Sequence, residues 1–132
     1  MQKQVEEIVK QFGADLGTIH LLEGDVLALK AHIGIPPNVV KVVSSVPIGR
    51  GMAGLAVERN EPVSSCNIQV DQTGDVRPGA KATGANGAIV VPIRDPQGHP
   101  RGALGIGVHR EYEYTPEETA RLLDEAAKLL TE

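Results

Sequence analysis

The sequence predicts an α+β fold in which helices pack on a central antiparallel sheet. Three observations lead to this prediction. Apolar residues recur at helical spacing at both ends, two pairs of strand-like segments lie between them, and a turn signal joins each pair. The 132 residues, 41% hydrophobic and 23% charged, fit one domain over residues 1–132 with one core.

The two ends of the chain carry the helical pattern. The first helix is predicted to continue to Phe12 and to end at Gly13, and its apolar face holds Val5, Ile8, Val9 and Phe12. The last helix is predicted to start after Thr115, because Pro116 suits the first helical position and Glu118 completes a capping box. Its apolar residues are Leu122, Leu123, Ala126, Leu129 and Leu130.

Both strand pairs have the length and turn residues of β-hairpins. In residues 14–34, two apolar runs flank Glu23-Gly24-Asp25. In residues 86–110, the turn is Asp95-Pro96-Gln97-Gly98, with proline at its second position and glycine at its fourth, as in a type I turn. The two hairpins supply four antiparallel strands.

The middle of the chain holds shorter elements. A brief helix is predicted after Pro36, and a helix of about two turns is predicted over residues 52–60. Residues 61–66 can form one more short strand. Residues 67–85 are rich in Gly, Asp, Thr and Pro without a period, and we interpret them as a long loop with a function.

Three glycines, Gly49, Gly51 and Gly54, have the G-x-G-x-x-G spacing of a dinucleotide-binding turn. That function requires a buried parallel strand before the turn, whereas the preceding residues are short and polar and include Pro47, which has no amide hydrogen. We therefore favour a steric role, in which the first two glycines allow a tight turn. The third would let a short helix pack close to the sheet.

The segment 102–108 has one face without large side chains, which makes that face a candidate wall of a ligand pocket. There Leu104, Ile106 and Val108 alternate with Ala103 and two glycines, which leaves one face nearly bare. A bare face serves either a close helix approach or a ligand, and polar residues of the long loop either contact that ligand or cap turns. The pocket candidates are Cys66, Asn67, Asp71, Thr73, Asp75, Gly105 and Gly107.

Composition argues against several functions. A net charge of −4 with scattered lysines and arginines predicts no nucleic acid partner. No apolar run is long enough to cross a bilayer, so we expect no membrane partner and a cytoplasmic location. One phenylalanine, two tyrosines and no tryptophan offer little to stack on a planar cofactor, and no cofactor is expected. Cys66, as the single cysteine, excludes an internal disulfide and is expected to be a small buried side chain.

Several segments together resemble the GAF domain family over nearly the whole chain. They are VPIGRGMAGLAVERNEPV, GAIVVPIRDPQGHPRGALGIGV and YTPEETARLLDEAAKLL. The resemblance implies an antiparallel sheet of five or six strands, with terminal helices on one face and a small-molecule pocket on the other. It also implies a sensory or regulatory role in signal transduction with an unidentified ligand. The expected partners are a second copy, which forms a homodimer through the terminal helices, and a signalling output protein, fused or separate.

The enzymatic branch to compare with this sequence is that of the free methionine sulfoxide reductases, which use several cysteines for catalysis. The corresponding positions here, around Ala53 and around residues 81–83, have no thiol, so no enzyme activity is expected. The Cys-His pair that attaches bilins and the cyclic-nucleotide pattern of the family are also missing. Two alternatives remain: a divergent reductase or hydrolase using Cys66 or a histidine–carboxylate pair, and a ligand-free dimerisation module.

The histidines are isolated in the sequence. His99 lies in a predicted turn and is expected to be exposed, whereas His20 and His109 would meet only if their strands are neighbours and their faces agree. Two imidazoles without a third ligand do not make a metal motif, so no metal site is predicted.

Overall fold

A six-stranded antiparallel sheet runs through the computed structural model, which describes residues 1–70 and 78–130. The strand order is β3-β2-β1-β6-β5-β4, and the fold is α+β, as the sequence predicted. The strands are β1 (Leu16–Glu23), β2 (Val26–Ile33), β3 (Ser45–Pro47), β4 (Val63–Ser65), β5 (Gly87–Arg94) and β6 (Pro100–Val108). The helices within these residues are α1 (Gln2–Phe12), α2 (Pro37–Val43), α3 (Gly51–Arg59), α4 (Pro78–Ala82) and α5 (Pro116–Lys128).

The two predicted hairpins form the centre of the sheet. β1 pairs with β2, and β5 pairs with β6. The turn of the second hairpin is closed by the Gly98 N–H, which donates to the Asp95 carbonyl at 2.9 Å. Strands β1 and β6 then join the hairpins, with Leu16 opposite Gly107. Both hairpin predictions are confirmed.

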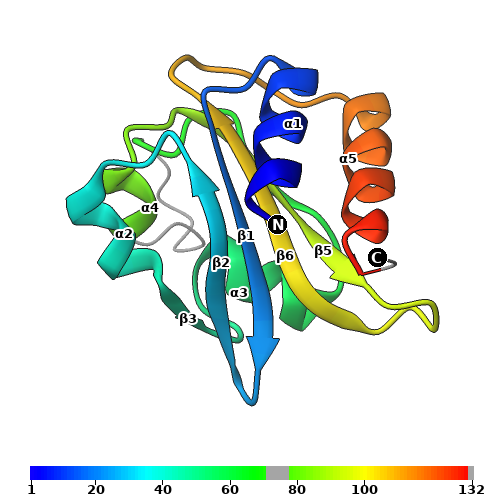
Figure 1. The fold of residues 1–132 in the computed structure, drawn as a ribbon. Helices are drawn as coiled ribbons and strands as arrows, with labels where there is room; N and C mark the ends of the chain where they lie inside the picture. Colours follow the sequence, from blue (N-terminus) through cyan, green and yellow to red (C-terminus); the bar gives the residue numbers. More distant parts are fainter. Residues whose placement is uncertain (71–77, 131–132) are drawn as a thin grey trace.

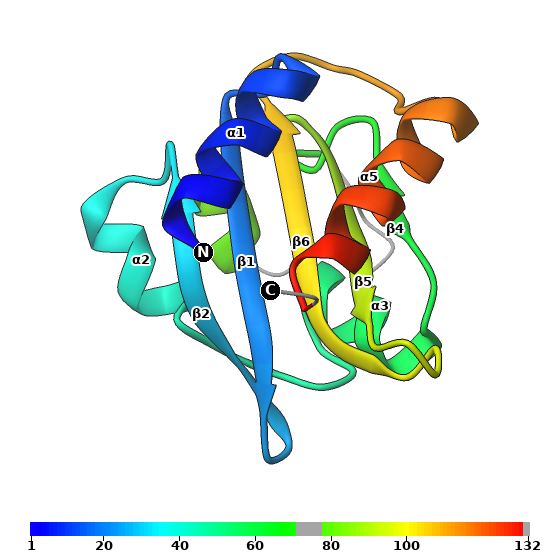
Figure 2. The same cartoon turned by 45° about the vertical axis from the view of Figure 1, so that its right-hand side comes forward.

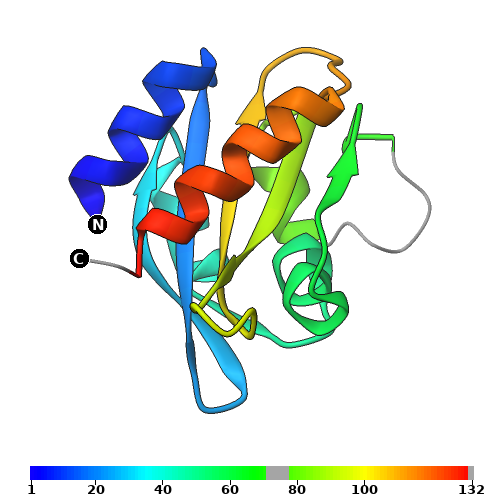
Figure 3. The same cartoon turned by 90° about the vertical axis from the view of Figure 1, so that its right-hand side faces the viewer.

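The helices form a layer on each face of the sheet (Figure 1). Helices α1 and α5 cover one face, where they lie across the central strands (Figure 2). Their buried side chains meet those of the strands in the largest core cluster, which includes Val5, Ile19, Leu104 and Leu122. Helix α3 lies on the opposite face (Figure 3), and it contacts β5 and β6.

Helix α1 ends and helix α5 begins where the sequence predicted. Gly13 ends α1 in the left-handed region, with φ of 63°. At α5, the Thr115 hydroxyl accepts from the Glu118 N–H at 3.1 Å, and the Glu118 carboxylate accepts from the Thr115 N–H at 2.9 Å. This reciprocal pair satisfies two backbone donors at the helix start.

Two short elements were not predicted. Strand β3 pairs with β2, with Val46 opposite Leu27, at an edge of the sheet where three residues suffice and a proline is tolerated. Helix α4 lies within the segment 67–85 that the sequence analysis interpreted as an irregular loop. Residues 71–77 of that segment are outside the described residues.

The three-glycine segment has the steric role that was favoured. Gly49 and Gly51 have φ of 85° and 68°, which allows the turn between β3 and α3. A Cβ at Gly54 would collide with the carbonyl oxygen of Pro47, so only glycine permits this close seating of α3. The surrounding sheet is antiparallel, which contradicts a dinucleotide-binding βαβ unit.

None of the helices in residues 1–70 and 78–130 combines the length and the apolar character that a bilayer span requires.

Candidate functional site

A cavity of about 360 Å³ lies between the sheet and helices α2, α3 and α4. Strands β1, β5 and β6 contribute its floor through residues such as Thr18, Val90 and Gly105. The first turn of α3 contributes Met52 and Ala53, and the end of α2 contributes Val43. Most of the surface in the cavity is apolar, which is typical of a small-molecule pocket.

Strand alternation places three residues of β1 in this cavity. Leu16, Thr18 and His20 occupy alternate positions and all line it, whereas Ile19 points into the opposite core beneath α1 and α5. Side chains of β1 therefore point alternately into the cavity and into the core beneath α1 and α5.

His20 is the buried polar side chain of the site, with 4% of its surface exposed. Its Nε2 atom lies 2.8 Å from the carbonyl oxygen of Val43, at the end of α2. A carbonyl oxygen only accepts, so Nε2 carries the hydrogen and donates. The Nδ1 atom is buried and has no hydrogen-bond partner among the described residues.

Burial lowers the pKa of His20 below its ordinary value of 6.5, although the hydrogen bond to Val43 acts in the opposite direction. Desolvation disfavours the charged ring more than this bond favours it. At neutral pH the imidazole is therefore neutral, and Nδ1 has a lone pair that can accept a hydrogen bond.

The two predicted glycines have different surroundings. Gly105 lines the cavity between Thr18 and Val90, and a Cβ there would lie 3.0 Å from Thr18 Oγ1 and 3.2 Å from Val90 Cγ2. At Gly107 a Cβ would lie 3.2 Å from the Cβ of Ala85, so this bare position allows a close packing contact. The structure thus places Gly105 in the cavity wall and Gly107 beneath a neighbouring segment.

Asn67 forms the hydrogen bonds expected of a turn-capping residue. Its amide nitrogen donates to Glu111 Oε1 at 3.0 Å. Its Oδ1 accepts from the Gln69 N–H at 3.1 Å and from Asn86 Nδ2 at 3.2 Å. Both polar atoms of the Asn67 side chain are therefore used in hydrogen bonds that hold the start of the segment 67–85.

Cys66 is exposed, and the expectation that it would be buried was wrong. It directly follows β4, which is an edge strand of the sheet, so no further strand of the described residues lies on its outer side. The remaining candidates, Asp71, Thr73 and Asp75, lie outside the described residues.

The histidines do not assemble into a site. His20 pairs with Ala103 near the start of β6, whereas His109 follows Val108 at its other end. The backbone N–H of His109 donates to Asp15 Oδ2 at 2.8 Å. Across residues 1–70 and 78–130 no group of three potential metal ligands occurs.

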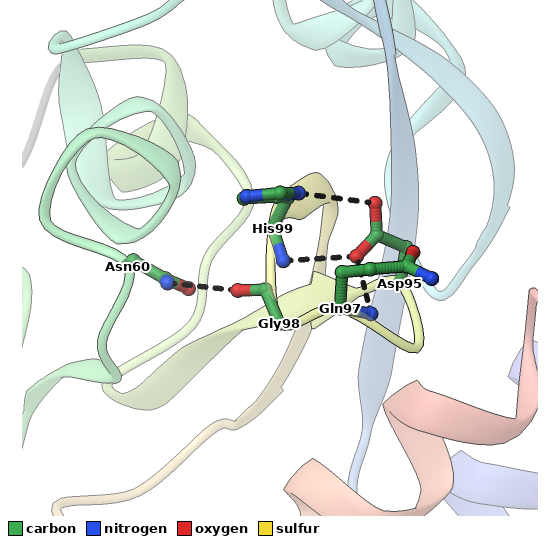
Figure 4. Close-up of polar contacts among 5 residues, drawn as sticks. All are labelled: Asn60, Asp95, Gln97, Gly98 and His99. Carbon is green, nitrogen blue, oxygen red and sulfur yellow. Dashed lines mark hydrogen bonds and ion pairs between the residues drawn. The ribbon is translucent and has the colours of Figure 1, made fainter.

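A hydrogen-bond network at the far end of α3 fixes this helix to the β5–β6 hairpin (Figure 4). Asn60 ends α3 with φ of 53°, and its Nδ2 donates to the Gly98 carbonyl at 3.1 Å. Arg94 donates from Nε to Asn60 Oδ1 at 2.8 Å and from Nη2 to the Asn60 carbonyl at 2.7 Å. In the same turn, the exposed ring of His99 lies 3.7 Å from Asp95 Oδ2.

Comparison with known proteins gives one family and several similar structures. A family model described as "GAF domain" matches residues 1–131. The GAF domain of a phosphoenolpyruvate-protein phosphotransferase from Coxiella burnetii aligns with a TM-score of 0.83 and 23% identity, covering 99% of this chain and 78% of that one. The search of curated proteins found no match.

Reductases share the same fold. The type II free methionine-R-sulfoxide reductase from Thermoplasma acidophilum aligns with a TM-score of 0.80 and 23% identity, covering 99% of this chain and 87% of that one. The free methionine-R-sulfoxide reductase from Neisseria meningitidis, solved in complex with its substrate, aligns with a TM-score of 0.80 and 20% identity. The alignment covers 98% of this chain and 73% of that one. At these identities the likeness is one of fold.

Proposed function

The chain belongs to the GAF domain family, and from this premise we propose that it binds a small molecule in the cavity beneath α2 and α3 and acts as a sensory or regulatory domain. The observation that carries the proposal is the apolar cavity itself, which has few polar groups and lies between a sheet face and short helices. Such concave apolar sites with a few convergent polar groups are the usual form of small-molecule pockets.

The sheet offers a direct route from the cavity to the terminal helices. Strands β1 and β6 have one face in the cavity, at His20 and Gly105, and the other against α1 and α5, at Ile19 and Leu104. A ligand that favours one position of these strands would bias the packing of both helices. We propose that the helices transmit this bias within a homodimer to a signalling output protein.

The side chains that line the cavity fit a ligand-binding function better than an enzymatic one. Ala53 lines the cavity at a position where the reductase branch of the family has a thiol, and the single cysteine, Cys66, is exposed outside the cavity lining. Redox chemistry of that branch requires a thiolate beside the substrate and a second thiol to resolve it. We therefore propose no catalytic function.

A thermal-shift screen with cyclic nucleotides, amino acids, 2-oxo acids and metal salts tests the binding proposal. A ligand of the native state raises the melting temperature by mass action. The variant Ala53→Leu partly fills the cavity, and Ala127→Leu makes the same change on the exposed surface of α5 as a matched control. We expect the shift in the wild type and in Ala127→Leu but not in Ala53→Leu.

A shift that persists in Ala53→Leu would place the ligand elsewhere and refute the cavity as the site. The absence of any shift across the screen would count against ligand binding and favour the dimerisation module. Sedimentation velocity at low concentration tests the homodimer separately, because a strict monomer contradicts it.

A further inference from the structure

The lining of the cavity has a charge opposite to that of the chain. Arg50 lines the cavity, whereas no Asp, Glu or Lys of the described residues does, and burial keeps the His20 ring neutral. The chain as a whole has a net charge of −4. A positive charge at a concave site of an acidic protein favours a ligand that carries negative charge.

Arg50 lies at the mouth of the cavity. Lining residues that remain exposed mark where the cavity opens to solvent, and Val42, Ser45 and Arg50 are among them. Within residues 1–70 and 78–130, the guanidinium of Arg50 has no hydrogen bond or ion pair. Its donors are therefore available to a ligand, and their planar fork matches the two oxygens of a carboxylate.

The start of α3 acts with the same sign. Gly51, Met52 and Ala53 form the first turn of α3 and line the cavity, and no side chain caps this turn. The N-terminal end of a helix carries partial positive charge. This helix end does not define a site alone, but it adds to the attraction that Arg50 exerts on an anion.

The floor of the cavity has room for an apolar body. Thr18 and Val90 lie opposite Gly105 on the two neighbouring strands. Both side chains are only half-buried, although they belong to inner strands of the sheet. The cavity therefore reaches the sheet surface at Gly105, where no side chain fills the space between them.

We infer that the ligand is a small organic acid whose apolar body lies over Gly105 and whose carboxylate pairs with Arg50 at the mouth. This inference rests on the proposed function of the cavity and adds the chemical class of its ligand. One guanidinium balances one negative charge, which favours a carboxylate over a doubly charged phosphate. An amino acid fits less well, because its ammonium group would lie near Arg50 without a carboxylate of the described lining to offset the repulsion.

Three probes with the same carbon chain test the inference: hexanoate, its uncharged amide hexanamide, and L-norleucine, which adds an ammonium group to the acid. Dissociation constants come from ¹H–¹⁵N spectra of the labelled protein at low salt. We expect hexanoate to bind about fivefold tighter than hexanamide, as for a solvent-accessible charged pair. We expect it to bind about threefold tighter than L-norleucine. The amides of Gly51 and Gly105 should shift together on binding.

Substitutions of Arg50 test its role directly. Arg50→Gln removes the charge and is expected to bind hexanoate and hexanamide within about twofold of each other. Arg50→Lys keeps the charge without the fork, so an intermediate preference is expected. Arg101→Gln makes the same change of net charge at an exposed arginine of β6 outside the described lining, and it should keep the full preference. The same spectra show that each variant is folded, and the ranking of the three probes on the wild type stands without the variants.

Several outcomes overturn the inference. If hexanoate and hexanamide bind the cavity equally, if L-norleucine binds tightest, or if the preference for hexanoate survives in Arg50→Gln, Arg50 does not select an organic acid, while the binding function stands. If none of the probes perturbs the cavity amides at its solubility limit, this ligand class is wrong. A cavity-dependent shift with another class in the thermal screen would then preserve the proposed function, and its absence would remove both.

Discussion

Replacing Gly54 with alanine tests how closely α3 is seated on the sheet. In most helices this change stabilises the protein by about 0.5–1 kcal/mol, because alanine has the higher helix propensity. Here the added Cβ would collide with the Pro47 carbonyl oxygen and lie 3.1 Å from the backbone nitrogen of Gly49. That turn is closed by the Gly49 N–H, which donates to the Gly54 carbonyl at 2.9 Å. Main-chain atoms held in this way cannot rotate out of the path of the Cβ.

The magnitude follows from two opposing effects. A carbon atom approaches a carbonyl oxygen to about 3.3 Å at closest, so α3 must withdraw from β3 or bend. Overpacking of this kind costs about 1–3 kcal/mol. Subtracting the propensity gain leaves about 0–2.5 kcal/mol, and because the Cβ meets main-chain atoms we expect a net loss of about 1–2 kcal/mol in the free energy of unfolding. For a chain of this size the melting temperature falls by roughly 3–8 °C.

Urea unfolding followed by circular dichroism gives the free energy of unfolding for the wild type and Gly54→Ala. Ala53→Gly is the matched control, since it changes the neighbouring helix position and is expected to cost about 1 kcal/mol, chiefly through helix propensity. Both substitutions should therefore destabilise, although they change propensity in opposite directions. A Gly54→Ala protein as stable as the wild type, or more stable, would refute the close seating of α3.

Three further predictions concern caps, hydroxyls and pH. Thr115→Ala removes the N-cap of α5 and is expected to cost about 1 kcal/mol of unfolding free energy, measured by urea titration against Thr115→Ser. Tyr114→Phe should raise the melting temperature, because its buried hydroxyl has no partner among the described residues, whereas Tyr112→Phe should lower it by removing the 2.8 Å bonds to Glu118. Burial holds the pKa of His20 below 6.5, so below that pH the unfolded chain binds more protons than the folded one. Stability is therefore expected to decrease as pH falls from 6.5 through the folded pKa, and His20→Gln should flatten this dependence in pH-dependent urea titrations. An unchanged slope in that variant would contradict the burial of a neutral ring.

The main elements of the fold could be predicted because their signals are local. Gly13, the Asp95–Gly98 turn and the Thr115 cap each act on residues within one turn, and the structure has all three where the sequence placed them. Strand β3 was missed for the opposite reason. Its three residues are extended because they pair with β2, a partner distant in the sequence, and tertiary pairing decides the conformation of such short segments.

The candidate site was predicted less completely. Alternation along β6 indicated a face without large side chains, and of its two glycines Gly105 lines the cavity whereas Gly107 lies against Ala85. His20 was considered only as a metal ligand, because its partner Val43 lies 23 residues away and gives no local signal. Its position two residues after Thr18, on the same face of an apolar strand, was the available indication. The burial of Cys66 was misjudged because sequence does not reveal whether anything covers the edge of a sheet.

Helix α3, which lies over the cavity, is held by side-chain hydrogen bonds at its last turn but not at its first. The last turn of α3 is bound to Arg94 and to the Gly98 carbonyl, whereas its first turn, beside the cavity, has no side-chain cap. Asn60 therefore couples the last turn of α3 to the β5–β6 hairpin, whereas the first turn is held by its close packing on β3. In hydrogen exchange, amides of the last turn should then open together with the β5–β6 hairpin, while those near Met52 exchange through smaller motions of their own.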